Sequence, residues 1–179
     1  MSTSLRLARE QCEKAFAGYL LAKKTELGLE CPLVSPVGVG VFIRKGQFDE
    51  DGNYVLQNPD EIPLPAVAVA CPRATPHDMG YPVCELHLMI FTGADEESAA
   101  DRASARFGFL HELFDESHTA ELFAALNPPV APDPDLRAVQ NFSIFGFYLT
   151  EDMGQETGRH WIDHLVYEVH GQPTDEPDE

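Results

Sequence analysis

Histidine residues near the C-terminus have the spacing of metal ligands. His160 and His164 lie four residues apart, with an aspartate directly before the second histidine. The glutamate that follows the first histidine in zinc metalloproteases is absent, and the neighbouring β-branched and aromatic residues favour a strand. On a strand, His160, His164, Glu168 and His170 share one face. Three imidazoles and a carboxylate can bind a metal, although a solvated or subunit-contacting face is the simpler interpretation.

An acidic segment around Gly52 has the composition of a calcium-binding loop but not its spacing. Counted from Asp49, the glycine is fourth, whereas an EF-hand loop needs glycine at the sixth position. Apolar runs at 41–43 and 54–56 flank Asp51-Gly52, and this pattern predicts a β-hairpin with that dipeptide as its turn. The tip of such a hairpin is a frequent place for contact between subunits.

A polar loop at 72–80 contains the adjacent residues His77 and Asp78. A catalytic or metal-binding pair would need a third group placed by the fold, so a solvated loop is the simpler interpretation. The chain has no nucleophile elbow, no glycine-rich phosphate loop and no dinucleotide-binding glycine motif. We therefore expect no enzymatic activity, no catalytic or metal-binding residue and no cofactor.

The cysteines Cys12, Cys31, Cys71 and Cys84 are far apart in the sequence. None forms a Cys-x-x-Cys pair, so the spacing indicates neither a zinc site nor a redox motif. Free cysteine is among the most buried residue types, and we expect four buried thiols.

The chain is strongly acidic, with a formal net charge of −18. Such a surface repels phosphate, which disfavours direct binding to nucleic acid. It can instead keep the protein soluble or contact a basic partner. No apolar run has the length of a signal peptide or of a membrane span. We expect a soluble protein that is made in the cytoplasm.

Hydrophobic periodicity predicts helices and strands in alternation. An apolar run at 66–71 has the pattern of a strand buried on both faces, and 82–92 that of a half-buried strand. The remaining predicted elements are a long helix ending near Leu27, a strand at 37–43, helices at 98–116 and 119–126, and strands at 139–150 and 160–170, with a polar turn at 151–158.

These elements predict an α/β (α+β) fold. We expect a mixed, mainly antiparallel sheet, with the long N-terminal helix and the central helix packed on it and a protruding β-hairpin. One domain would cover residues 1–171, with the hairpin as an insertion at about 42–60, and 172–179 would be a disordered acidic tail.

The order of patterns along the chain also carries a resemblance. An acidic loop precedes the strand beginning Leu64-Pro65-Ala66, and the strand Val83–Thr92 is followed by Gly93-Ala94-Asp95-Glu96. Next come a long helix through His111-Glu112-Leu113 and a short helix with Leu122 and Leu126. The last element of the pattern is a strand with Phe142-Ser143-Ile144-Phe145-Gly146. Over residues 5–170 this order resembles the tail terminator and tail-completion (minor tail, neck) proteins of tailed bacteriophages. The insertion from Phe42 to Asp60 is longer than in that pattern, so the neighbour that the hairpin contacts stays open.

The resemblance implies a virion protein with no active site. Subunits of this family form a ring, commonly a hexamer, that caps the tail tube and stops its polymerisation. The ring would contact the tail tube protein and a neck, connector or head-completion protein, and DNA would pass through its lumen without specific binding. A lumen of negative charge would not retain the DNA.

Candidate subunit-interface residues follow from the loops and from two arginines one turn apart on the predicted central helix. They are Asp51, Gly52, His77, Asp78, Arg102 and Arg106. Two other functions stay open: a small metal-binding protein or enzyme that uses His160, His164 and His170, and a monomeric adaptor.

Overall fold

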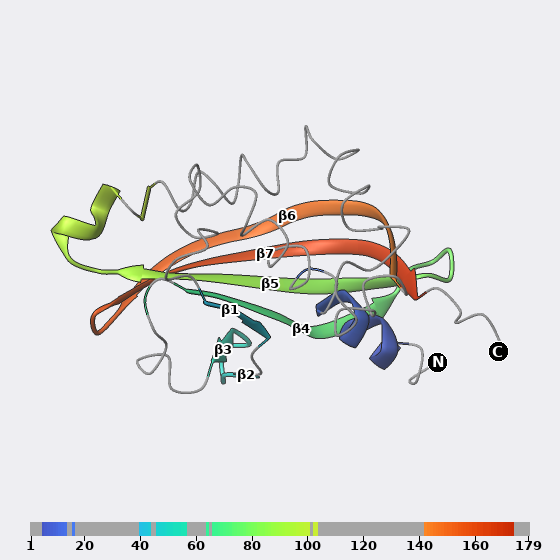
Figure 1. The fold of residues 1–179 in the computed structure, drawn as a ribbon. Coiled ribbons are helices and arrows are strands. Elements are labelled where there is room, and N and C mark those ends of the chain that lie inside the picture. The colour runs from blue at the N-terminus through green and yellow to red at the C-terminus, as the bar shows by residue number, and fades with distance from the viewer. Residues whose placement is uncertain are drawn as a thin grey trace.

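A five-stranded sheet and a separate two-stranded hairpin form the described structure (Figure 1). The computed structural model describes residues 5–13, 16, 40–43, 46–56, 64, 66–100, 102–103 and 142–173. The strands are β1 (Gly40–Ile43), β2 (Gly46–Phe48), β3 (Tyr54–Leu56), β4 (Ala66–Pro76), β5 (Pro82–Gly93), β6 (Phe142–Thr157) and β7 (His160–Pro173). The large sheet has the order β1-β4-β5-β7-β6, and β2 pairs with β3.

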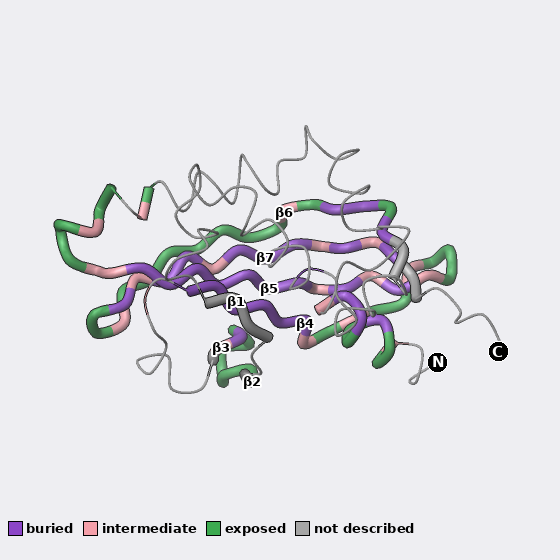
Figure 2. Tube along the Cα trace, in the orientation of Figure 1, coloured by how far each residue is buried: buried purple, intermediate pink, exposed green. Residues whose placement is uncertain are grey.

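The large sheet is mixed and mainly antiparallel, as predicted. Only β1 runs parallel to its neighbour, β4, among the described strands. The run Ala66–Cys71 is at most 1% exposed, which confirms the strand buried on both faces. Figure 2 shows the buried stretches along β4, β5 and β7, with exposed residues in the turns and along much of β6.

Strand β5 is buried on both faces, so the prediction of a half-buried strand is wrong. Its alternation is as predicted, but His87 and Met89 on the second face are only 4% and 2% exposed. Tyr54 of the hairpin joins Met89 and Phe91 in one core cluster. A separate element therefore covers the face that the sequence pattern assigned to solvent.

The hairpin has a different first strand from the predicted one. Strand β2 pairs with β3, whereas 41–43 belong to β1 and join the large sheet. Asp49 closes the turn, because its Oδ1 accepts hydrogen bonds from the backbone N–H groups of Asp51 and Asn53. Gly52 has a positive φ of 83°, a backbone conformation that favours glycine. Gln47, Phe48 and the tip are exposed, whereas Tyr54 of β3 is buried against the sheet, so the hairpin packs on the sheet through β3 and does not protrude freely.

Strand β6 continues through the segment predicted as a polar turn. Its second half pairs with β7 as far as Thr157, and the turn is at Gly158, whose φ is 59°. Pairing with β7 satisfies the backbone here, while the acidic side chains remain exposed on an edge strand. Strand β7 extends to Pro173, so the predicted tail at 172–179 begins two residues too early, and 174–179 lie outside the described residues.

The described residues support only short helical stretches where two long helices are predicted. Residues 5–13 and 16 are helical, and a 3-10 turn, η3 (Glu96–Ser98), capped by Asp95, leads into helical residues at 99–100 and 102–103. The rest of the two predicted ranges and the predicted helix at 119–126 lie outside the described residues. In the part of the chain that is described, no helix has both the length and the apolar composition that crossing a membrane requires.

The N-terminal helix (residues 5–13) and the hairpin cover opposite faces of the sheet. Phe16 stacks on Phe147, which stacks on Tyr167, with ring centroids 5.5 and 4.4 Å apart. Tyr54 lies against His87, with ring centroids 5.0 Å apart. His87 and Tyr167 occupy opposite faces, because residues paired across β5 and β7 share a face and successive residues alternate.

Replacing Tyr54 with alanine should destabilise the protein by about 3 kcal/mol, because a large buried ring is lost from the core cluster. Chemical denaturation followed by circular dichroism measures this free energy of unfolding. Phe48 is the matched control: it lies on the same hairpin but is 40% exposed, so Phe48→Ala should cost less than about 1.5 kcal/mol. Equal losses for both variants would contradict the packing of the hairpin through Tyr54.

Candidate functional site

A cavity of about 410 Å³ lies between the hairpin and the large sheet. Phe48 and Tyr54 line it from the hairpin, and His87 and His164 line it from β5 and β7. Arg73, Glu85, Glu151, Met153 and Glu168 are also among its lining residues. We call this space the hairpin cavity. Residues from six strands line it, so no local sequence motif predicts it.

Three side chains in the hairpin cavity form a continuous hydrogen-bonded chain. Nε2 of His87 is 2.7 Å from Oε1 of Glu85, and Nδ1 of His87 is 2.6 Å from Nε2 of His164. Residue 164 is paired with Met89, two residues along β5 from His87, so the two imidazoles are diagonal neighbours on one face. The sequence placed His164 on this face but did not identify His87 as its partner.

The hydrogen-bonded chain determines which nitrogens carry protons. The carboxylate of Glu85 can only accept, so His87 donates from Nε2. Neutral His87 then accepts at Nδ1, and His164 must donate from Nε2. This arrangement leaves Nδ1 of His164 as the basic end of the chain. The three groups can take up a proton there or accept a hydrogen bond from a ligand.

Burial keeps both imidazoles neutral. Desolvation, assisted by the neighbouring His87, lowers the pKa of His164 to about 4. Desolvation also lowers the pKa of His87, against the opposing effects of its hydrogen bond to Glu85 and of that residue's charge. Perturbed pKa values in a cavity are typical of functional sites, although structural networks produce them too.

The cavity is richer in negative than in positive groups. Glu85, Glu151 and Glu168 all line it, and Arg73 is the single lysine or arginine among the lining residues. Nε of Arg73 lies 3.4 Å from Oε2 of Glu85, and its guanidinium lies 4.4 Å from the ring centroid of Phe48. The cation is therefore already engaged within the protein, and the remaining carboxylates favour a positively charged ligand.

The predicted histidine face of the last strand does not form a single site. At about 3.3 Å per residue, His160 and His164 are about 13 Å apart along β7, and His164 and His170 about 20 Å. His160 is fully buried and its ring lies edge-on to Phe91, whereas Nε2 of His170 is 2.5 Å from Oε1 of Glu168. Each histidine thus has separate surroundings, and the proposed three-histidine metal site is not formed.

An aromatic cluster lies at the end of the sheet that contains the β4–β5 turn. Tyr81 is its centre: its ring stacks on His77 and meets Phe145 edge-on, with centroids 4.4 and 4.7 Å apart. Its hydroxyl is 3.1 Å from Nδ1 of His170, which also contacts the ring of Tyr148. Phe145 and Tyr148 are nevertheless 46% and 52% exposed. We call Tyr81, Phe145 and Tyr148 the edge patch.

The candidate interface residues are scattered over the molecule. Asp51 and Gly52 are exposed at the hairpin tip, and Asp78 is exposed in the β4–β5 turn, where His77 contacts the edge patch. Arg102 donates hydrogen bonds to the carbonyl oxygens of Gly93 and Asp95, at 2.6 and 2.7 Å, and so serves its own chain. Arg106 lies outside the described residues.

Comparison with known proteins assigns no family to this architecture. No protein-family model matches the chain, and no curated protein matches it.

Replacing His164 with glutamine should flatten the pH dependence of stability. Because the folded pKa is about 4 and the ordinary value is 6.5, the unfolded chain takes up a proton first as the pH falls, and stability is lost between about pH 6.5 and 4. From pH 7 to 4.5, the loss of unfolding free energy should be smaller in His164→Gln than in the original protein by on the order of 2 kcal/mol.

Denaturation curves at both pH values measure this difference. His77→Gln, in the β4–β5 turn outside the hairpin cavity, is the control, and its unfolding free energy should depend on pH as in the original protein. If the original protein and His164→Gln lose the same unfolding free energy between the two pH values, the protonation of His164 does not contribute to the pH dependence.

Proposed function

We propose that the protein is a structural subunit that assembles with copies of itself into a ring, without enzymatic activity. We further propose that the ring caps the tail tube of a bacteriophage next to its neck and is therefore part of the virion. The exposed edge patch is the observation that carries the self-assembly part of this proposal. The resemblance in the order of sequence patterns supports the tail-capping part.

The edge patch has the composition of a subunit contact. Phe145 and Tyr148 expose large rings that contact Tyr81 of the β4–β5 turn and His170 of β7. Aromatic side chains are enriched at protein interfaces, because they bury a large area at little cost in conformational entropy. The patch therefore offers a neighbouring subunit a pre-ordered apolar surface.

The position of the patch on β6 favours a second copy of the chain as its partner. Among the described strands, β6 pairs with β7 alone and so forms one edge of the large sheet. Its second half presents Glu151, Asp152 and Glu156 to solvent, and charges of this kind prevent unwanted strand pairing. The first half contains the exposed rings, so contact would be limited to this end of the strand.

The net charge agrees with a ring through which DNA passes. At −18 per chain, several copies around a channel would repel the phosphate backbone and would not retain the DNA. Association of subunits with this charge also needs an apolar contact or a basic partner to overcome their repulsion, and the edge patch supplies the former.

Adding charge to the edge patch should separate the subunits. We expect the original protein to form an oligomer with a defined multiple of the 19.8 kDa chain mass, and Phe145→Asp with Tyr148→Asp to be a folded monomer. Light scattering after size-exclusion chromatography measures the masses, and electron microscopy shows whether the oligomer is a ring. Gln155→Glu, an added charge at the other end of β6, is the control and should stay oligomeric.

A protein that remains monomeric up to millimolar concentration would contradict self-assembly and favour the monomeric adaptor. An oligomer that is unchanged by the double substitution would contradict the edge patch as its contact. The tail-capping part predicts a tail-tube or tape-measure gene next to the gene for this chain, and a gene neighbourhood without tail genes counts against it.

Binding of a small cationic ligand is a second candidate function. It is favoured by the carboxylates of the hairpin cavity, where Glu151 is a diagonal neighbour of His164 across β6 and β7. An ammonium group could donate hydrogen bonds to His164 and to a carboxylate at the same time.

A small alkyl diamine is a suitable probe for this second candidate. Its addition should shift the imidazole NMR signals of His87 and His164 in a concentration-dependent way, and should leave those of His77 unchanged. Glu151→Gln should weaken the effect several-fold, because one carboxylate charge is removed. The absence of any shift at millimolar diamine would exclude this function.

A further inference from the structure

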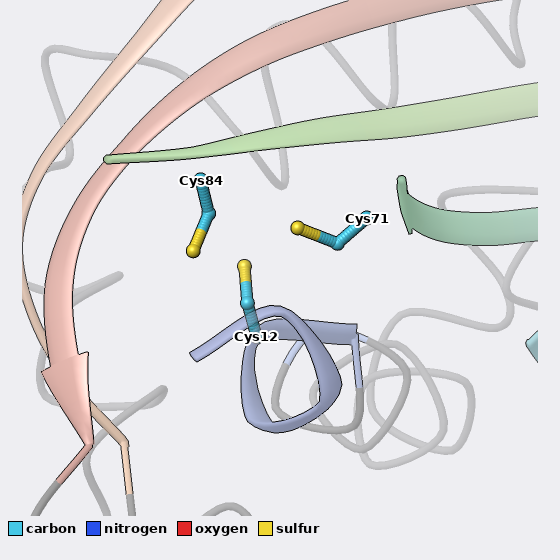
Figure 3. Close-up of side chains that lie close together, drawn as sticks. All are labelled: Cys12, Cys71 and Cys84. Atoms are coloured by element: carbon cyan, nitrogen blue, oxygen red, sulfur yellow. The ribbon is translucent and has the colours of Figure 1, made fainter. Parts of the chain in front are cut away.

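Three cysteines that are distant in the sequence meet on the face of the sheet opposite the hairpin cavity. Cys12 comes from the N-terminal helix, Cys71 from β4 and Cys84 from β5, and Figure 3 shows their sulfur atoms directed toward one another. All three Sγ atoms lie within 4.8 Å of one another, and the side chains are at most 1% exposed. The prediction of buried free thiols is confirmed for these three residues, but their spacing in the sequence did not indicate that they meet.

The register of the sheet explains this convergence. An irregularity in the pairing between Ala70 and Arg73 places Cys71 diagonally across from Cys84, on the face that the N-terminal helix covers. Cys12 lies one helical turn after Ala8, and both are fully buried against the sheet. The helix thus adds a third sulfur above the two from the sheet.

The sulfur positions suit a shared metal ion. Zinc bound by thiolates has Zn–S distances of about 2.3 Å, which places two sulfurs on one tetrahedral ion about 3.8 Å apart. Moving from separations of at most 4.8 Å to this value needs shifts of less than about 1 Å per sulfur. Among the described residues, no further histidine, cysteine or carboxylate belongs to this group. The three described sulfurs leave the fourth tetrahedral position of the ion open to a further ligand.

The surroundings can compensate the charge of such a site. Three thiolates and one divalent ion have a net charge of −1, and Arg9 lies beside them, where its Nε donates a hydrogen bond to the carbonyl oxygen of Cys71 at 3.0 Å. The guanidinium of Arg9 is therefore placed to offset the net negative charge of the site.

We propose that Cys12, Cys71 and Cys84 bind one zinc ion as three thiolates, and that this ion fastens the N-terminal helix to the sheet. Each sulfur that is still protonated releases its proton to solvent on binding, and no oxidation takes place. This site is structural and is independent of the ring and of the hairpin cavity.

Metal analysis of the full chain tests the site. Protein purified under reducing conditions without chelators should contain about one zinc ion per chain, and chelation should lower its thermal midpoint. Cadmium added to the metal-free protein should produce a sulfur-to-metal charge-transfer band in the ultraviolet. Cys84→Val and Cys71→Val, which remove a ligand but keep an apolar side chain of similar size, should lose most of the zinc and of the band.

Val69→Ala is the matched control, because it opens a buried position of β4 without removing a thiol. It should keep the full zinc content. The proposal is overturned if the original protein neither contains zinc nor gives the cadmium band, or if the valine variants fold and retain their metal. The cadmium band of the original protein decides the question even where a valine variant fails to fold.

Discussion

The antiparallel pairing of β5 with β7 determines where every other feature of the protein lies. Eleven consecutive residue pairs, from Val83 with His170 to Gly93 with His160, join these strands without an irregularity. Paired residues face the same side, so this ladder assigns His87 and His164 to one face and Cys84 to the other. A shift of one residue between these strands would place His87 and His164 on opposite faces and remove their contact.

The two faces have different chemistry because different elements cover them. The hairpin leaves a cavity over the imidazoles, in which Tyr54 excludes water from one side and glutamates from three strands contribute negative charge. The N-terminal helix packs directly on its face, and the thiols there are fully buried. An open cavity suits a ligand that exchanges with solvent, whereas a closed cluster of sulfurs suits an ion that stays bound.

The edge of the sheet is the third surface on which function can depend. Strand β6 combines two exposed aromatic rings with an acidic second half, and the pairing irregularities at Phe145 and Thr150 separate these two parts. Irregularities of this kind bend a strand and redirect side chains. An edge that is aromatic in its first half and acidic in its second half limits the ways in which a second copy can approach.

Local sequence patterns were sufficient to identify several strands of this fold and the faces of some of them. The apolar run at 66–71 reports how its own residues are buried, whereas the alternation at 82–92 identifies a strand but not the burial of its second face. Only the tertiary structure decided which elements meet. His87 and His164 are 77 residues apart, and Cys12 reaches two strands that begin more than fifty residues later. Periodicity is a property of neighbouring residues, whereas register and the packing of the helix and the hairpin depend on contacts between distant ones. The acidic half of β6 shows the same limit, since its composition resembles a turn and its pairing with β7 makes it a strand.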